Sequence, residues 1–384
     1  MFADRFKARL NLQAAAGLLR NPPEVSGREG KYLIIGDRKV LNFASNDYLG
    51  LGNCNSLKRA AAECFERYGT SSSSSRLVSG NYSAIAAAEK RFAEYFGYTD
   101  ALFFPSGYQA NLGVLSAFFR DGDTIVFDKH IHNSSVKGMV MGGARFYGFN
   151  HADLKHLEKR LMVVRNGQTA VLTEALYSMD GDLLDTAGLK RLKEKYNCLA
   201  VVDEAHSFGA LGSGGRGIAH GVADIAVGTL GKAFGLFGAF ALLPEGFKEY
   251  LFNFSAPLIY STTLPEAHAA TAVEALKIVE AGDDRRARLA EASAGMKEGL
   301  KEKGFRVTGD AHILALEIGE EARSAALAKY LLEKDIFVLP ARYPTVALGR
   351  AILRISMTAM HEKADTDLFA RTVMEGYEKI DKVR

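Results

Sequence analysis

Two apolar runs near the middle of the chain each end directly in polar residues. Residues 199–202 and 225–227 have the length and the β-branched content of buried strands. The polar residues that follow are Asp203, Glu204 and His206 after the first run, and Thr229 and Lys232 after the second. Because the carboxyl ends of parallel strands form the crevice in which ligands bind, an acid and an amine delivered there together indicate a cofactor site. The alternative interpretation is an ordinary Asp and Lys on two surface loops.

The pair formed by Lys232 and Asp203 suits one kind of cofactor. Lys232 lies in VGTLGKAFG, where small residues let a ligand approach the backbone. A semi-buried lysine gives up its proton readily, and the neutral amine can form a Schiff base. Asp203 could hold a protonated heteroaromatic nitrogen by a charge-assisted hydrogen bond. The aldehyde and the pyridinium nitrogen of pyridoxal 5'-phosphate need these two groups.

A third segment could bind the phosphate of such a cofactor. PSGYQAN, at 105–111, follows an expected strand and begins an expected helix. The backbone amides of Ser106, Gly107 and Tyr108 would then point at an anion, because helix N-termini attract negative charge. Taken alone, the segment favours an ordinary strand-to-helix turn.

The composition is that of a soluble globular enzyme. The 384 residues are 48% hydrophobic and 24% charged, with a formal net charge of +3 and no basic block, which argues against nucleic acid as the main partner. The three cysteines share no metal-like spacing and indicate reduced thiols, typical of a cytoplasmic protein. The N-terminus lacks the apolar core of a secretory signal, and no apolar run reaches the roughly 18 residues that span a bilayer.

The length and the order of the elements predict a large α/β domain followed by a smaller one. A first helix begins at Phe2 and is expected to continue through Arg20, before Pro22 and Pro23. A small hairpin is expected at 32–43. Helices are expected at 56–68 and 84–96, the second ending at a glycine. Strands are expected at 101–104, 125–127, 145–149, 170–173, 199–202, 225–227 and 239–243, which with helical crossovers form a mainly parallel seven-stranded sheet covered on both faces.

The expected domain ranges follow from this order. Residues 1–45 form an N-terminal helix and hairpin arm, which packs on the body or on a partner subunit. Residues 46–277 form the large cofactor-binding domain. Residues 278–384 form a small C-terminal α+β domain, because helical patterns alternate there with short apolar runs at 313–318 and 353–356. Between the helices expected at 56–68 and 84–96, GTSSSSSRLVSGNY at 69–82 could be a flexible linker. Arg76 directly after the serines makes a site-lining loop at least as good an interpretation.

Taken together, the motifs resemble the α-oxoamine synthases, a family of fold-type I pyridoxal-phosphate enzymes. The shared segments are collinear over nearly the whole chain: SNDYLGL, SRLVSGN, FPSGYQAN, the HIHNSS region after Asp128, EALYSMDGD, VDEAHSFG, GRG, TLGKA, YSTTLP and LRISMTAMH. The resemblance implies a fold-type I transferase that acts as a homodimer with shared active sites. It also implies a decarboxylative condensation of an amino acid with an acyl thioester.

The resemblance assigns roles to residues of this chain. Lys232 would form the Schiff base with the cofactor and later take the Cα proton of the substrate, while Asp203 would pair with the ring nitrogen. His132 would stack on the ring, and His206 would contact its phenolic oxygen. The remaining cofactor contacts would be Gly107, Tyr108 and Thr229 at the phosphate, Ser178 beside the cofactor, and Ser261 or Thr262 at the phosphate of the neighbouring subunit. Arg354 would hold the amino-acid carboxylate, with Asn46 close by.

The same resemblance narrows the range of expected substrates. SRLVSGN and YPTV are most similar to the members that join L-alanine to a pimeloyl thioester, of CoA or of acyl carrier protein, in biotin biosynthesis. Arg20 and Thr345 occupy positions that bind substrate in those members. The alternatives are another condensing member, such as glycine C-acetyltransferase or a long-chain acyl enzyme, or a non-catalytic subunit of a heteromeric member. The intact set of Lys232, Asp203 and the two histidines argues against a non-catalytic subunit.

Several of these residues also have purely structural interpretations. Arg20 could cap a helix C-terminus, Ser178 could cap SMDGD, and Asn46 could be a turn residue. His130 and His132 could suggest a metal, but the sequence offers no obvious third ligand, so no metal is expected. Three glycines, Gly212, Gly214 and Gly217, fit GxGxxG by chance. The chain departs from the family at Ser71–Ser75, where glycines are usual, at Gly231 and at Glu266; the serines leave the acyl-chain preference open.

Overall fold

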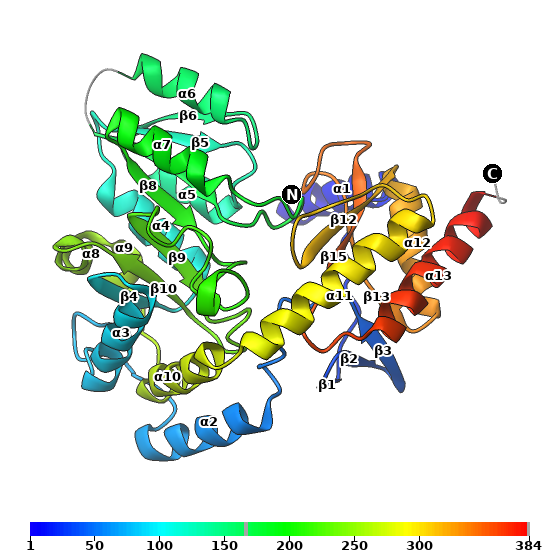
Figure 1. The fold of residues 1–384 in the computed structure, drawn as a ribbon, viewed down its shortest axis with the longest axis horizontal. Coiled ribbons are helices and arrows are strands. Elements are labelled where there is room, and N and C mark those ends of the chain that lie inside the picture. Colours follow the sequence, from blue (N-terminus) through cyan, green and yellow to red (C-terminus); the bar gives the residue numbers. More distant parts are fainter. Residues whose placement is uncertain (165–167, 382–384) are drawn as a thin grey trace. The chain divides into compact units, whose positions relative to one another are not determined.

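The computed structural model describes residues 1–164 and 168–381 and divides the chain into two compact units. The larger unit contains Leu49–Ser178 and Leu183–Arg286. The smaller contains Met1–Tyr48, Met179–Asp182 and Ala287–Arg384. Figure 1 shows the elements of both units, coloured along the chain.

The larger unit is built on a seven-stranded sheet. Its strands are β4 (Asp100–Phe104), β5 (Thr124–Asp128), β6 (Arg145–Phe149), β7 (Thr169–Glu174), β8 (Leu199–Asp203), β9 (Ile225–Thr229) and β10 (Ala239–Leu243). Their order across the sheet is β4-β10-β9-β8-β7-β5-β6, and β10 is antiparallel to both of its neighbours. The strands from β9 to β6 are parallel. The predicted mainly parallel sheet is therefore confirmed.

Successive side chains of the strands point to opposite faces of this sheet, and each face packs against different helices. Leu102 and Phe104 pack in one core cluster with Val114 of α4 (Gly107–Phe118). Phe103, between them, points to the other face and meets Phe92 of α3 (Ser83–Phe96), with ring centroids 5.0 Å apart. Because strand side chains alternate between faces, these apolar runs can bury both sides. A helix lies against each face near β4, as expected for such a sheet.

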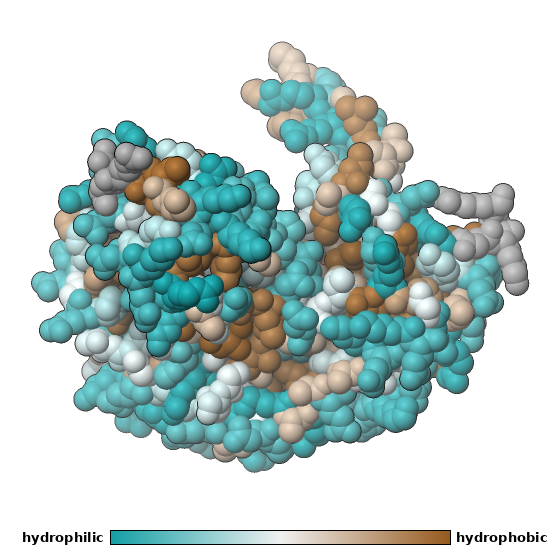
Figure 2. Space-filling view, turned by 45° about the horizontal axis from the view of Figure 1, so that its top comes forward, coloured by the Kyte–Doolittle hydropathy of each residue, from teal (hydrophilic) through white to brown (hydrophobic). Residues whose placement is uncertain are grey.

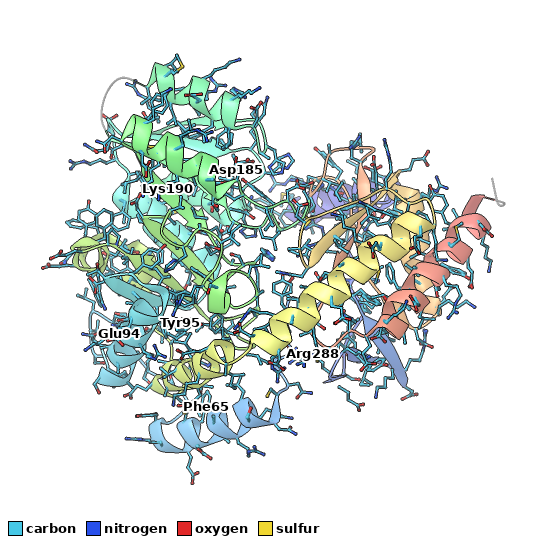
Figure 3. All side chains as sticks on the ribbon, viewed as in Figure 1. Phe65, Glu94, Tyr95, Asp185, Lys190 and Arg288 are labelled. Carbon is cyan, nitrogen blue, oxygen red and sulfur yellow. The ribbon has the colours of Figure 1, made fainter. Side chains whose placement is uncertain are left out.

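The remaining helices of the larger unit connect or cover these strands. They are α2 (Asn55–Tyr68), α5 (Asn133–Met141), α6 (Leu154–Val163), α7 (Thr186–Tyr196), the short η1 (Ser213–Gly215), α8 (Phe247–Phe254), α9 (Ala256–Ile259) and α10 (Glu266–Glu280). Asp185 caps the start of α7, and its Oδ1 accepts a hydrogen bond from the Gly188 amide at 2.8 Å. Figure 3 shows Asp185 at this end of α7.

The smaller unit contains two four-stranded sheets. The first has the order β1-β2-β3-β13, formed by β1 (Gly27–Glu29), β2 (Tyr32–Ile35), β3 (Arg38–Asn42) and β13 (Ile336–Phe337). The second has the order β11-β12-β15-β14, formed by β11 (Val307–Thr308), β12 (Ile313–Gly319), β14 (Leu339–Ala341) and β15 (Ala351–Ser356). The helices are α1 (Phe2–Ala15), α12 (Glu321–Glu333), α13 (Lys363–Asp381) and most of α11 (Asp283–Glu302).

The N-terminal hairpin forms part of the smaller unit because it pairs with a distant strand. β3 lies parallel to β13, with Leu41 opposite Ile336. The amide of Phe43 donates to the carbonyl of Phe337, and the amide of Ser356 donates to the carbonyl of Phe43. Phe43 is fully buried and its ring lies 4.7 Å from that of Phe369. The hairpin therefore contributes to the same core as the C-terminal residues.

These pairings place the domain ranges differently from the sequence prediction. The prediction treats residues 1–45 as a separate arm, whereas in the structure they fold with residues 287–384. The predicted boundary at 277/278 lies inside the last turn of α10, whereas the compact units divide after Arg286, inside α11. Residues 179–182 also belong to the smaller unit, where the Asp310 amide donates to the Gly181 carbonyl at 2.8 Å.

The first helix is shorter than predicted. It ends at Ala15, and Gly17 adopts a positive φ of 66° that a helix does not allow. The two prolines therefore lie well beyond its end, and Arg20 lies in an irregular segment. No residue of α1 is buried. Its large apolar side chains are among those that reach the surface, where Figure 2 shows hydrophobic residues in patches among mostly hydrophilic ones.

The serine-rich segment is anchored by a buried ion pair. The Arg76 guanidinium contacts the Glu89 carboxylate at 2.6 Å and the Asn81 side chain at 2.8 Å, and Arg76 is only 3% exposed. Ser72 donates to the Thr263 carbonyl at 2.8 Å. These contacts contradict the flexible-linker interpretation, because a buried charge pair fixes the segment next to YSTTLP. Within the described residues, no helix combines the length and the apolar character that crossing a membrane requires.

Candidate active site

Two carboxylates lie side by side where β7 and β8 end. Glu174 and Asp203 are paired across the two parallel strands, and both are buried. Asp203 Oδ1 accepts the Ala205 amide at 2.9 Å, and Oδ2 accepts the Asn111 side-chain amide at 2.7 Å. The strand ends thus deliver a hydrogen-bonded carboxylate to the predicted cofactor crevice.

Lys232 contacts one of the predicted histidines. Its Nζ lies 2.7 Å from Nε2 of His206, which is 8% exposed. Lys232 follows β9 by a tight turn, in which Thr229 Oγ1 donates to the Gly238 carbonyl and accepts the Gly231 amide.

The expected phosphate-binding residues lie at the start of α4. Gly107 is the first residue of the helix, and Ser106 caps it by accepting the Gln109 amide. A Cβ built on Gly107 would lie 3.8 Å from Cβ of Thr229, so the helix start and the end of β9 are in contact. The Tyr108 ring lies 6.4 Å from the His132 ring, edge to face. This arrangement places a helix N-terminus next to the predicted ring-binding residues.

His132 is held by its backbone and by its ring. Its amide donates to Glu174, and its Nδ1 lies 2.7 Å from Ser134 Oγ. Burial lowers the pKa of His132; the Lys232 charge lowers it further, and the Asp203 charge opposes both. Because each of these charges acts on His132, the histidine predicted to stack on the ring forms one electrostatic cluster with the acid and the amine.

Glu174 is a site residue that sequence reasoning did not single out. Its carboxylate accepts the backbone amides of His132 and Ser178. Burial and the neighbouring Asp203 raise the pKa of Glu174 to about 8, against the opposing effects of Lys232 and the two amides. The same signal that indicated Asp203, a polar residue at the end of a buried strand, was present at Glu174.

Two further residues at this site were missed. Asn111 and Ser134 are both buried, and they hydrogen-bond each other at 3.0 Å. Asn111 lies inside the quoted PSGYQAN segment, and Ser134 lies inside HIHNSS. Their spacing in the sequence carries no signal, because only the packing of α4 against α5 brings them together.

Glu204, beside Asp203, has a structural role in the larger unit. Its carboxylate accepts the Ser207 hydroxyl and the amides of Ile218 and Ala219, the latter at 2.7 Å. Burial raises the pKa of Glu204 to about 7, although these hydrogen bonds oppose the rise. Glu204 therefore holds the glycine-rich GRG turn in place. The chance GxGxxG match in this region forms a 3-10 turn and not the strand-to-helix turn of a dinucleotide site.

The predicted carboxylate-binding pair lies together in the smaller unit. Arg354, on β15, is 3% exposed, and its guanidinium donates to Ser356 Oγ and, at 3.4 Å, to Asn46 Oδ1. Asn46 Oδ1 also accepts the Tyr48 hydroxyl at 3.1 Å. Burial raises the pKa of Tyr48 to about 12, while nearby Arg354 lowers it. Asn46 thus orients the guanidinium and is more than a turn residue.

Arg342 connects the two segments predicted to bind the acyl chain. Its guanidinium donates to the Gly17 carbonyl, three residues before Arg20, and its carbonyl accepts the Thr345 amide at 2.9 Å. Arg20 and Thr345 are both exposed. Arg20 does not cap a helix C-terminus, because α1 ends before it.

The other predicted residues are placed as follows. Thr262 is exposed and Ser261 half-buried, next to Thr263, which bonds the serine-rich segment. The His130 ring stacks on His151 at 4.1 Å, so His130 and His132 have different neighbours.

The residues of the larger unit fit pyridoxal phosphate by their donor set. A primary amine, a buried carboxylate, a helix N-terminus and an exposed histidine with a lowered pKa match its aldehyde, its ring nitrogen, its phosphate and its ring face. Lys232, Asp203, Gly107 and His132 would hold these four parts.

Comparison with known proteins agrees with this site. The profile of the family "aminotransferase class I and II" matches residues 38–373. An 8-amino-7-oxononanoate synthase from Geotalea daltonii is 40% identical over 94% of this chain and 95% of its own length. A serine palmitoyltransferase from S. paucimobilis, solved with a bound PLP–myriocin aldimine, has a TM-score of 0.92 at 26% identity, covering 98% of both chains. An 8-amino-7-oxononanoate synthase from Francisella tularensis has a TM-score of 0.77 at 30% identity, covering 88% of this chain and 98% of its own.

The chain belongs to the aminotransferase class I and II family, with the fold of the fold-type I transferases and pyridoxal phosphate as its cofactor. Within that family it belongs to the α-oxoamine synthases, which are acyltransferases, and the predicted resemblance is confirmed.

Proposed function

We propose that this protein condenses L-alanine with a pimeloyl thioester, of CoA or of acyl carrier protein. The products are 8-amino-7-oxononanoate, CO2 and the free thiol, and the step belongs to biotin biosynthesis. The observation that carries the chemistry is the cluster of Lys232, His206, Asp203 and His132. The relative from Geotalea daltonii supports the choice of substrates. We further propose that the protein works in the cytoplasm as a homodimer, with Ser261 or Thr262 completing the partner's phosphate site.

The chain's own groups would divide the work as follows. Bound pyridoxal phosphate supplies an aldehyde for the substrate amine and a ring that accepts an electron pair from the substrate Cα. Lys232 Nζ would take the proton from Cα, and His206, in contact with that nitrogen, would orient it. Asp203 would stabilise a positive charge on the ring nitrogen, because its carboxylate is buried and already held by two hydrogen bonds.

The substrates would be held by the predicted arginines. Arg354 would bind the amino-acid carboxylate, a task that suits a guanidinium kept in place by Asn46 and Ser356. Arg20, with Thr345, would bind the far end of the acyl chain. An exposed guanidinium there favours a chain that ends in a carboxylate.

The enzyme activity is tested first with Lys232→Ala. The substitution removes the covalent link and the base, so we expect turnover to fall by more than about a thousandfold and the borohydride-sensitive visible absorption to vanish. Lys190→Ala, on the exposed surface of α7 (Figure 3), is the matched control and should behave as the wild type. Substantial condensation by Lys232→Ala would overturn the assignment of the base.

The substrates are tested by a thiol-release assay. Alanine, glycine and serine are crossed with acetyl, pimeloyl and palmitoyl thioesters, and alanine with pimeloyl thioester should give the highest kcat/KM. If glycine with acetyl-CoA or serine with palmitoyl-CoA is preferred, the proposed substrates are wrong, while the condensation chemistry remains supported.

A further inference from the structure

A chain of hydrogen bonds joins Asp203 to His132 inside the larger unit. The Asn111 side-chain nitrogen donates to Asp203 Oδ2 at 2.7 Å and to Ser134 Oγ at 3.0 Å. Ser134 Oγ lies 2.7 Å from His132 Nδ1. Asn111 is 3% exposed and Ser134 is fully buried, so water cannot replace the contacts that Asn111 makes with Asp203 and Ser134. The two groups predicted to contact the cofactor ring are thus connected through α4 and the start of α5.

The Asp203 carboxylate sets the direction of these bonds. A carboxylate only accepts hydrogen bonds, so the Asn111 nitrogen must face it, and a reversed amide would bring two oxygens together. The second hydrogen on that nitrogen is then directed to Ser134 Oγ, which accepts it. The Ser134 hydroxyl hydrogen remains available for His132 Nδ1.

The backbone amide of Ser134, like its hydroxyl, favours a His132 ring that carries no proton on Nδ1. The Ser134 amide, which can only donate, points to His132 Nδ1 at 3.3 Å. Two donors directed at one ring nitrogen require that nitrogen to carry no proton. His132 must therefore be neutral, with its proton on Nε2, and the lowered pKa of His132 agrees with a neutral ring.

We propose that Asn111 and Ser134 are positioning residues that hold His132 as the neutral Nε2–H imidazole and couple it to the Asp203 carboxylate. This inference rests on the proposed function for its role in the reaction. A neutral ring places no positive charge on the face of the cofactor, so the ring nitrogen at Asp203 remains the site where positive charge is stabilised. The Nε2–H group remains as a donor on the other side of the imidazole.

The first experiment measures the His132 tautomer in the full-length apoprotein. Nitrogen-15 NMR of histidine-labelled protein distinguishes a protonated from an unprotonated ring nitrogen, and His132→Gln assigns the signal. We expect Nδ1 unprotonated in the wild type between pH 6 and 8. In Ser134→Ala the neutral form loses a donor, so the ratio of protonated to neutral His132 should rise about tenfold at a given pH.

The matched control is the neighbouring serine. Ser135 is 1% exposed on the same helix, and its Oγ has no hydrogen-bond partner among the described residues. Ser135→Ala therefore removes a buried hydroxyl without touching the chain of bonds, and the His132 signal should stay unchanged. Equal effects of Ser134→Ala and Ser135→Ala, or a wild-type His132 that carries its proton on Nδ1, would overturn the proposal.

The second experiment follows Asn111 in the holoenzyme. Asn111→Leu keeps the approximate volume and removes both donors, and Asn111→Asp keeps the shape but faces Asp203 with a second acid. We expect both variants to shift the pH titration of the cofactor's visible absorption and to lower kcat about 10- to 100-fold, with KM for the acyl thioester within twofold of the wild type. An unchanged titration in both folded variants contradicts the coupling.

The proposed function and the positioning role of Asn111 and Ser134 can fail separately. If the NMR shows the expected tautomer but no pair of amino acid and thioester is condensed, the proposed function is wrong and the hydrogen-bond assignment stands. If condensation occurs while Ser134→Ala and Asn111→Leu leave both the tautomer and the titration unchanged, the positioning role is wrong and the proposed function stands.

Discussion

At the scale of single residues, Glu174 makes the stability of the protein depend on pH. Burial and Asp203 raise its pKa to about 8 from 4.5, so the folded state binds this proton more tightly than the unfolded state. A raised carboxyl pKa contributes stability that is complete below about pH 4.5 and is lost as the pH rises through 8. The free energy of unfolding should therefore fall over this range by up to about 5 kcal/mol on account of this group.

Glu174→Gln cannot ionise and should remove this loss. Urea unfolding of the apoprotein between pH 5 and 8.5 should show a flatter dependence of the free energy of unfolding on pH than in the wild type. Glu94→Gln, at an exposed position of α3 (Figure 3), is the control and should leave the slope unchanged. Parallel curves for the wild type and Glu174→Gln would show that Glu174 does not carry a raised pKa.

Arg20 allows a second prediction at this scale. If its guanidinium binds the distal carboxylate of the acyl chain, Arg20→Ala should raise KM for the pimeloyl thioester about tenfold, the effect of one charge-assisted hydrogen bond. KM for a heptanoyl thioester, which has the same length but no distal carboxylate, should not change. Arg9→Ala, on exposed α1, controls for general loss of positive charge. Equal effects on both thioesters would contradict the assigned contact.

At the scale of elements, the GRG turn requires glycine at Gly217 for two reasons: the positive φ and the closeness of the Glu204 side chain. Gly221 shares only the first reason. Gly217 has a φ of 79°, and a Cβ there would lie 2.6 Å from Oε2 of Glu204. Gly221 has a φ of 74°, but a Cβ there meets nothing within 4 Å among the described residues. Gly221→Ala should therefore cost only backbone strain, about 1 kcal/mol. Gly217→Ala should cost roughly 2–4 kcal/mol, because it also displaces the Glu204 carboxylate.

Thermal or urea unfolding of the two alanine variants measures this difference. Both carry the same substitution at nearly the same φ, so their difference in the free energy of unfolding isolates the steric contact with Glu204. Equal destabilisation of the two variants would mean that the turn relaxes away from Glu204 at little cost.

Elements of the larger unit were predictable because their signals are local. Each strand of the sheet is a short apolar run that ends in turn residues, and all seven predicted runs form strands. The end of α1 was not predictable from apolar spacing, which continues to Leu18. It is decided at Gly17, where the backbone adopts a positive φ.

At the scale of the whole molecule, the smaller unit should require the N-terminal hairpin. Deleting residues 1–43 removes β1–β3 with the fully buried Val40 and Phe43, and exposes the pairing edge of β13. Losing large buried side chains costs about 3 kcal/mol or more each, so residues 287–384 should become sensitive to protease. Deleting only residues 1–15, which contribute no buried side chain, should leave that segment resistant.

Limited proteolysis with mass spectrometry distinguishes the two deletions. Resistance of residues 287–384 in the longer deletion would mean that the C-terminal segment forms a core without the hairpin. Rapid cleavage there in the shorter deletion would mean that α1 stabilises the unit despite its exposure.

The sequence by itself determined the class of this protein and its main chemical groups. Lys232 and Asp203 were identifiable because each follows a buried strand, and the collinear motifs named the cofactor that both serve. Only the tertiary structure decided which other groups join them. Glu174 lies beside Asp203 because β7 and β8 are neighbours in register, and it contacts His132 because β7 also pairs with β5, which precedes His132. Asn111 reaches Ser134 because α4 packs on α5. Such contacts join residues far apart in the chain, so their spacing in the sequence carries no information about them.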